Sequence, residues 1–137
     1  MEQPHHGMRI LVAEDNLINR RLISKVLERM GRPALVVENG QEALDALADG
    51  PFSMILMDIQ MPVMDGMEAT RRIRAGEVAS ADPDIPIIAL TAHTHDDDRE
   101  RCISAGMTDH LPKPIDIGEL RRLVARHNPA DGQTADG

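Results

Sequence analysis

The chain has 137 residues, a length typical of one domain and sufficient for a substantial hydrophobic core. Its 23 Asp and Glu exceed its 15 Lys and Arg, and the formal net charge of −8 disfavours nonspecific nucleic-acid binding. A single cysteine, Cys102, excludes an intrachain disulfide, and no apolar run approaches the about 20 residues of a membrane span. We therefore expect a cytoplasmic protein that contacts neither nucleic acid nor membrane.

Strand-like apolar runs alternate with segments whose apolar residues recur at helical spacing. In chain order the predicted elements are strand 10–13, helix 17–30, strand 34–37, helix 40–48, strand 52–57, helix 67–74, strand 87–90, helix 97–105, strand 110–111 and helix 117–126. Asp15 or Asn16 is placed to cap the first helix, and Gly31 to end it.

Five strand-then-helix units predict an α/β domain, with a parallel sheet covered by helices on both faces. The strands are apolar on both sides, as such a sheet requires. We expect one domain over residues 8–127. The polar, non-periodic segments 1–7 and 128–137 are expected to be disordered.

Polar side chains follow four of the predicted strands at their C-terminal ends. Glu14 and Asp15 follow the first strand, Asp58 the third, Thr91 the fourth and Lys113 the fifth. The carboxyl ends of parallel strands meet at one edge of a sheet, where ligand sites form. The sequence therefore predicts that these side chains share one crevice.

These positions lie in four short motifs, namely Val-Ala-Glu-Asp-Asn at 12–16, Met-Asp-Ile-Gln-Met-Pro-Val-Met-Asp-Gly at 57–66, Leu-Thr-Ala at 90–92 and Lys-Pro at 113–114. In this order and spacing the chain resembles the receiver domain of two-component response regulators, and most closely the receivers of hybrid sensor histidine kinases. The resemblance implies a flavodoxin-like, doubly wound, five-stranded sheet of order 2-1-3-4-5 with five helices.

Three carboxylates, from Glu14, Asp15 and Asp58, are expected to crowd together in the crevice. Two such charges 4 Å apart repel by about 4 kcal/mol at an effective dielectric of 20, and a divalent cation relieves this. Oxygen ligands favour Mg²⁺ or Mn²⁺. By the resemblance Asp15, Asp58 and the backbone carbonyl of Gln60 bind the ion directly, and Glu14 binds it through water.

The resemblance also implies that Asp58 accepts a phosphoryl group from a phosphohistidine. Lys113 would pair with Asp58 and then with phosphate, in a Lys-Pro bond that is cis. The Thr91 hydroxyl would bind another phosphoryl oxygen, and backbone N–H groups near Gln60 and Ala92 would complete the cradle. His110 stands where receivers usually carry an aromatic ring that moves with the threonine, so this switch is expected to be looser and sensitive to pH.

The implied function is a phosphoacceptor switch in a His-to-Asp phosphorelay. Its partner would be a histidine kinase or a histidine phosphotransfer protein, docked near Asn19, Leu22 and Ile23. The chain would be a monomer or weak dimer and no conventional enzyme, because it would assist only the phosphorylation and autodephosphorylation of its own Asp58.

Two other functions remain open from the residues alone. A Mg²⁺-dependent phosphatase or phosphotransferase with an aspartate nucleophile requires a second acid two residues after that aspartate, but position 60, two residues after Asp58, is Gln. A flavin or nucleotide binder needs a Gly- or Ser/Thr-rich loop after the first strand, where this chain has Glu14-Asp15-Asn16.

Overall fold

The computed structural model describes residues 9–91 and 96–127. Strands and helices alternate without exception in this part of the chain: β1 (Arg9–Ala13), α1 (Leu17–Arg29), β2 (Ala34–Val37), α2 (Gly40–Asp49), β3 (Phe52–Asp58), α3 (Gly66–Arg74), β4 (Ile87–Thr91), α4 (Asp96–Ala105), β5 (Asp109–Pro112) and α5 (Ile117–His127). Every expected element is present, with ends within one residue of the prediction. Strands β3 and β4 end one residue later than expected because Asp58 and Thr91 still pair, with Leu90 and Pro112.

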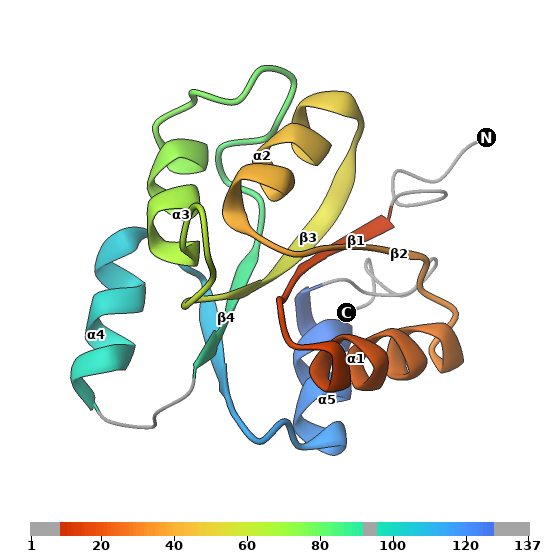
Figure 1. The fold of residues 1–137 in the computed structure, drawn as a ribbon. Helices are drawn as coiled ribbons and strands as arrows, with labels where there is room; N and C mark the ends of the chain where they lie inside the picture. Colours follow the sequence, from red (N-terminus) through yellow and green to blue (C-terminus); the bar gives the residue numbers. More distant parts are fainter. Residues whose placement is uncertain (1–8, 92–95, 128–137) are drawn as a thin grey trace.

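All five strands are parallel and lie in the order β2-β1-β3-β4-β5. Helices α1 and α5 lie on one side of the sheet, and α2, α3 and α4 lie on the other (Figure 1). The predicted α/β fold and strand order are confirmed. None of the helices within the described residues is long and apolar enough to cross a membrane.

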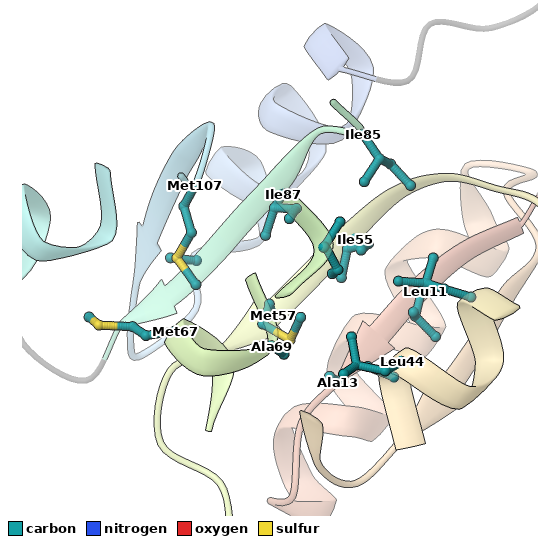
Figure 2. Packing of buried hydrophobic residues seen from close by; sticks show 14 of the residues in the cluster. Leu11, Ala13, Leu44, Ile55, Met57, Met67, Ala69, Ile85, Ile87 and Met107 are labelled. Atoms are coloured by element: carbon teal, nitrogen blue, oxygen red, sulfur yellow. The ribbon is translucent and has the colours of Figure 1, made fainter. Parts of the chain in front are cut away.

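Alternate residues of each strand point to opposite faces of the sheet and so enter two separate cores. Toward α2, α3 and α4 point Leu11, Ala13, Ile55, Met57, Ile87 and Ala89 (Figure 2). Toward α1 and α5 point Ile10, Val12, Met54, Leu56, Ile88 and Leu90. These twelve side chains are fully buried, which fixes the sheet between its two helical layers and holds its carboxyl edge in place.

The structure shows which residue caps the N-terminus of α1. The side chain of Asn16 accepts a hydrogen bond from the backbone N–H of Asn19 at 3.0 Å, so Asn16 is the N-cap. The helix ends at Arg29, and Gly31 follows with φ of +74°. Because Asn16 does the capping, the neighbouring Asp15 stays exposed and unused by the helix.

The loop between β3 and α3 is closed by backbone hydrogen bonds. The N–H of Gly66 donates to the carbonyl of Ile59 at 2.9 Å, and the N–H of Gly40 donates to the carbonyl of Met64 at 2.9 Å. A Cβ at position 66 would lie 2.1 Å from the carbonyl oxygen of Asp58, so only glycine fits there. The loop is therefore held against both β3 and the start of α2.

Within that loop Val63 adopts a backbone conformation that suits few side chains. Its φ is +69°, and the N–H of Met64 donates to the carbonyl of Pro62 at 2.7 Å across it. This is a γ-turn with a positive φ at its central residue, which is the strained type, and the β-branched side chain of Val63 increases the strain. The Val63 side chain is 82% exposed, so packing does not compensate.

Candidate functional site

Three carboxylates meet at the carboxyl edge of the sheet, as the sequence predicted. Glu14 follows β1 and is fully buried, Asp58 ends β3 and is 4% exposed, and Asp15 is exposed. One oxygen from each lies within 4.8 Å of the others. Within the described residues this is the one group of three or more acid, histidine or cysteine side chains that approach so closely.

Lys113 joins two of these acids from the end of β5. Its Nζ lies 3.1 Å from Oδ2 of Asp58 and 3.1 Å from Oε1 of Glu14. Its backbone N–H donates to the carbonyl of Thr91 at 2.7 Å, which holds this residue beside the end of β4, and the Lys113–Pro114 bond is cis. The sequence predicted the pair with Asp58 but missed the one with Glu14.

Burial and crowding change the ionisation of the site. Burial and the negative charge of Glu14 raise the pKa of Asp58 to about 7, although Lys113 partly opposes this. Burial alone would lower the pKa of Lys113, but the charges of Asp58 and Glu14 outweigh it and raise that pKa. The lysine therefore stays protonated, and one ammonium faces more negative charge than it neutralises.

The donor atoms of this site suit a hard divalent cation. Oε1 of Glu14 is buried and has no hydrogen bond, since its contact with Lys113 has ion-pair distance without hydrogen-bonding geometry. Its Oε2 accepts from the N–H of Asn16 at 3.1 Å, and Oδ1 of Asp58 accepts from the N–H of Gln60 at 3.3 Å. All the donors are oxygens, which fits Mg²⁺ or Mn²⁺ better than a metal that prefers nitrogen or sulfur.

Thr91 lies on β4, the strand next to β3, and His110 lies on β5, one strand further out. The Thr91 hydroxyl is buried and has no hydrogen-bond partner among the described residues. His110 pairs with Ala89 along β4 and β5, and its side chain is 29% exposed in a hollow of about 400 Å³ that α4 and α5 also line. The N–H group expected from Ala92 lies outside the described residues.

This arrangement is suited to receiving a phosphoryl group. The carboxylate of Asp58 faces the crevice and can act as a nucleophile, and the adjacent ammonium of Lys113 can neutralise phosphoryl oxygens. The buried hydroxyl of Thr91 can donate a hydrogen bond to a phosphoryl oxygen. Position 60 is glutamine and exposed, so the second acid of an aspartate phosphatase is absent from that position. The turn after β1 holds acids, which would repel the phosphates of a nucleotide.

The comparisons with known proteins agree with this chemistry. The family model for the response regulator receiver domain matches residues 10–125. The sensor histidine kinase GacS of Pseudomonas protegens is 41% identical over 118 residues, which are 86% of this chain and 13% of GacS. The signal transduction histidine-protein kinase BarA of Escherichia coli K12 is 37% identical over 126 residues, 92% of this chain and 13% of BarA. The chain thus spans about an eighth of these relatives.

Solved structures of receiver domains also match this chain in three dimensions. The receiver domain of the sensor histidine kinase PA1611 of Pseudomonas aeruginosa, with a magnesium ion coordinated in its active site cleft, is 41% identical. It matches with a TM-score of 0.78 over 88% of this chain and 97% of that one. A chain of the co-crystal of Saccharomyces cerevisiae Ypd1, a histidine phosphotransfer signaling protein, and the receiver domain of Ssk1 matches at 30% identity and a TM-score of 0.79, over 88% of each.

Proposed function

Because this chain belongs to the family of response regulator receiver domains, we propose that it is the phosphoacceptor of a His-to-Asp phosphorelay, with Asp58 as the acceptor. The observation that carries the proposal is the position of Asp58, buried at the end of β3 between Lys113 and two further acids. The domain comprises residues 8–127 and works in the cytoplasm.

The chemical step is an in-line displacement at phosphorus. A carboxylate oxygen of Asp58 forms the new O–P bond, and the P–N bond of the phosphohistidine breaks with its electron pair passing to the imidazole. The ammonium of Lys113, already 3.1 Å from Asp58, neutralises charge on the phosphoryl oxygens. Positioning and charge neutralisation are all that this reaction needs from the protein, so a small site without a further base suffices.

The acids would hold a divalent cation for this step. Asp15, Asp58 and the backbone carbonyl of Gln60 are its proposed direct ligands, and Glu14 acts through water. Mg²⁺, or Mn²⁺ in its place, supplies positive charge against the oxygens of the transferring group. The crowding of three carboxylates around one ammonium and the raised pKa of Asp58 support this assignment, because both point to more negative charge than Lys113 alone compensates.

Thr91 and His110 would carry the signal away from the site. The Thr91 hydroxyl lacks a partner and would donate to a phosphoryl oxygen on Asp58. Movement of Thr91 would then open space beside His110, one strand over. His110 has room to turn because it is half-buried beside a hollow, and its charge sets how readily it enters an apolar space.

The proposed donor is a histidine kinase or a histidine phosphotransfer protein. It would dock near Asn19 and Leu22 of α1, the helix that starts beside the acids; Ile23, also expected at this surface, is fully buried in the core and cannot contact a partner. The similarity to the histidine kinases GacS and BarA, to the receiver domain of PA1611 and to a chain of the Ypd1–Ssk1 co-crystal supports this class of partner. The domain itself is proposed to act as a monomer or weak dimer.

Phosphorylation by a small donor tests the proposal without any partner protein. Purified protein is treated with acetyl phosphate and Mg²⁺, and the added mass of one phosphoryl group is measured. Asp58→Asn should abolish the label, while the control Asp65→Asn, in the same motif but exposed and capping α3, should keep it. Undiminished label in Asp58→Asn would show that the acceptor is another residue. Repeated turnover of the donor without a labelled intermediate would favour a phosphatase.

A further inference from the structure

A hollow of about 400 Å³ lies at the β5 edge of the sheet, and none of the acids that meet beside Asp58 lines it. β5 is the edge strand, with α4 on one side of the sheet and α5 on the other, and all three elements line the hollow (Figure 1). Sites for small molecules in proteins commonly measure about 300–1,000 Å³, so this space has the size for a small ligand.

Groups that carry or can gain positive charge converge on this hollow from all three elements. Arg99 comes from α4, His110 from β5, and Arg126 and His127 from α5. The two histidines are the only ones within the described residues, and histidine ordinarily changes its charge between pH 5 and 8. Arg99 is exposed and has no ion pair with another described side chain.

One acid, Asp109, faces these groups and does not balance them. Its Oδ2 lies 3.4 Å from Nε2 of His127 and 3.9 Å from a guanidinium nitrogen of Arg126. Its Oδ1 lies 4.0 Å from Nδ1 of His110. Once both imidazoles are protonated, the hollow therefore holds four positive charges against one negative charge.

The hydroxyl of Thr108 also lines the hollow and is left as a hydrogen-bond donor. Its oxygen accepts from the N–H of Ile87 at 3.0 Å and from the guanidinium of Arg74 at 3.3 Å. A hydroxyl has two acceptor positions and one hydrogen, so its acceptor positions are filled and the hydrogen can only donate. Ile103 of α4 adds an apolar surface, since it lines the same space and is 58% exposed. The hollow thus requires a ligand that is anionic, accepts hydrogen bonds and has an apolar part.

We propose that this hollow binds a small soluble phosphomonoester, whose phosphate contacts Arg99, Arg126 and His127 and whose apolar part covers Ile103. A phosphate presents several acceptor oxygens and a double negative charge, which match a set of guanidinium, imidazolium and hydroxyl donors. The volume of the hollow exceeds what one phosphate group needs, which leaves room for the organic part. This site is separate from the acceptor crevice, so the inference goes beyond the proposed function.

Protonation of the two histidines should tighten binding. The charged groups around them are Asp109 of β5, Arg99 of α4, and Arg122 and Arg126 of α5. Arg122 pairs chiefly with Glu119 and feels the charge of Asp109 less. Carboxylates and guanidiniums ordinarily keep their charge between pH 6 and pH 8, so the imidazoles supply the positive charge that is gained as the pH falls.

A bound phosphate would also act on the switch residue His110. It attracts the imidazole and holds it at the surface, against the movement that phosphorylation of Asp58 is proposed to cause. By linkage the beryllofluoride form should then bind the ligand more weakly than the unmodified protein. Only this effect rests on the proposed function, and the binding itself does not.

The test is an NMR titration of isotope-labelled protein in a chelating buffer without Mg²⁺. The probes are phenyl phosphate, phenylacetate as its carboxylate counterpart, vesicles that contain phosphatidic acid, and inorganic sulfate, whose charge is the same at pH 6 and pH 8. Wild type is compared with Arg99→Gln/Arg126→Gln and with the control Arg29→Gln/Arg121→Gln, which removes two exposed arginines outside the hollow. His127→Asn tests the pH dependence. Melting curves check the fold, and labelling by acetyl phosphate with Mg²⁺ checks the acceptor site.

Phenyl phosphate should cause saturable shifts of the amides of residues 108–110 in wild type. Its affinity should fall about tenfold or more in Arg99→Gln/Arg126→Gln and stay within about twofold in the control. Sulfate should bind wild type about fivefold more tightly at pH 6 than at pH 8, and His127→Asn should reduce this ratio. The beryllofluoride form, prepared with Mg²⁺, should bind phenyl phosphate about fivefold more weakly.

Shifts that do not saturate, or equal affinities in wild type and Arg99→Gln/Arg126→Gln, would leave only a nonspecific attraction and overturn the site. Equal affinity for phenylacetate would overturn the preference for phosphate. Binding to the vesicles without a response to phenyl phosphate would assign the hollow to a lipid head group. Equal affinity of the beryllofluoride form would overturn the link to His110. Failure of labelling by acetyl phosphate would overturn the proposed function, whereas the site would stand on its own titration.

Discussion

Replacing Asp58 with asparagine is expected to stabilise the protein at neutral and alkaline pH when no divalent cation is present. The carboxyl has an ordinary pKa of 3.8 when the chain is unfolded and of about 7 when it is folded. Between these values the folded state binds a proton that the unfolded state releases, so stability falls as pH rises. The loss is complete above about pH 7 and absent below about pH 4.

The size of the effect follows from the pKa difference. About three pKa units correspond to about 4 kcal/mol, because one unit equals 1.36 kcal/mol. Asp58 lies at the surface end of β3 beside the exposed Asp15, where water and ions reduce the repulsion. We therefore expect Asp58→Asn to gain about 2 kcal/mol at pH 8, or roughly 6–10 °C in Tm.

Urea or thermal unfolding in a chelating buffer at pH 4.5 and pH 8 measures this gain. Asp65→Asn serves as the control, since Asp65 is exposed and its amide still caps α3. A gain of the same size at both pH values, or no gain at pH 8, would refute the argument that buried negative charge destabilises the fold.

Four further results are expected. Millimolar Mg²⁺ should raise the Tm of the wild type, because a ligand of the folded state adds ~2.7 kcal/mol to the free energy of unfolding at 100 times its Kd. The Tm of Asp15→Ala should rise less, and an equal rise in both proteins would contradict the assignment of Asp15 as a ligand. Gly66→Ala should lower the free energy of unfolding by about 1–3 kcal/mol, because its Cβ would meet the backbone of β3, and an unchanged denaturation midpoint would refute the close approach. Val63→Asn should raise that free energy by up to about 1 kcal/mol, since asparagine tolerates positive φ; a loss on chemical denaturation would mean that the turn is unstrained. Binding of the beryllofluoride form to its phosphotransfer partner, followed by fluorescence anisotropy at pH 6 and pH 8, should vary more in wild type than in His110→Tyr, and identical pH dependence would make His110 a passive surface residue.

The sequence predicted the fold well because strands apolar on both sides and short connections allow few arrangements. It also predicted that Glu14, Asp15, Asp58 and Lys113 meet, because each follows a parallel strand. It did not reveal that Glu14 is fully buried while Asp15 is exposed. Successive residues at a strand end point in opposite directions, and which of two neighbouring acids turns inward depends on the neighbouring strands rather than on its own type.

The sequence likewise did not predict the long-range contacts of single side chains. Arg74 ends α3 and looks like an ordinary charged residue, yet its guanidinium donates to the carbonyls of Gly106 and Pro83 at 2.7 and 2.6 Å. It also donates to the hydroxyl of Thr108 at 3.3 Å, which accepts from the N–H of Ile87. Such a contact depends on how α3 is placed against α4, and no local pattern encodes that distance.

The two loops that flank α3 differ in how they would accept inserted sequence. The loop before it is bonded through Gly66 to Ile59, the residue after β3, and through Met64 to the first residue of α2, so extra residues there would separate these bonds and displace Asp58. The connection after it contains the exposed residues 79–80, far along the chain from any acid of the site. A peptide tag or a reporter domain inserted at 79–80 would lengthen a surface loop at small entropic cost. That position offers a way to label the protein while its acceptor site stays intact.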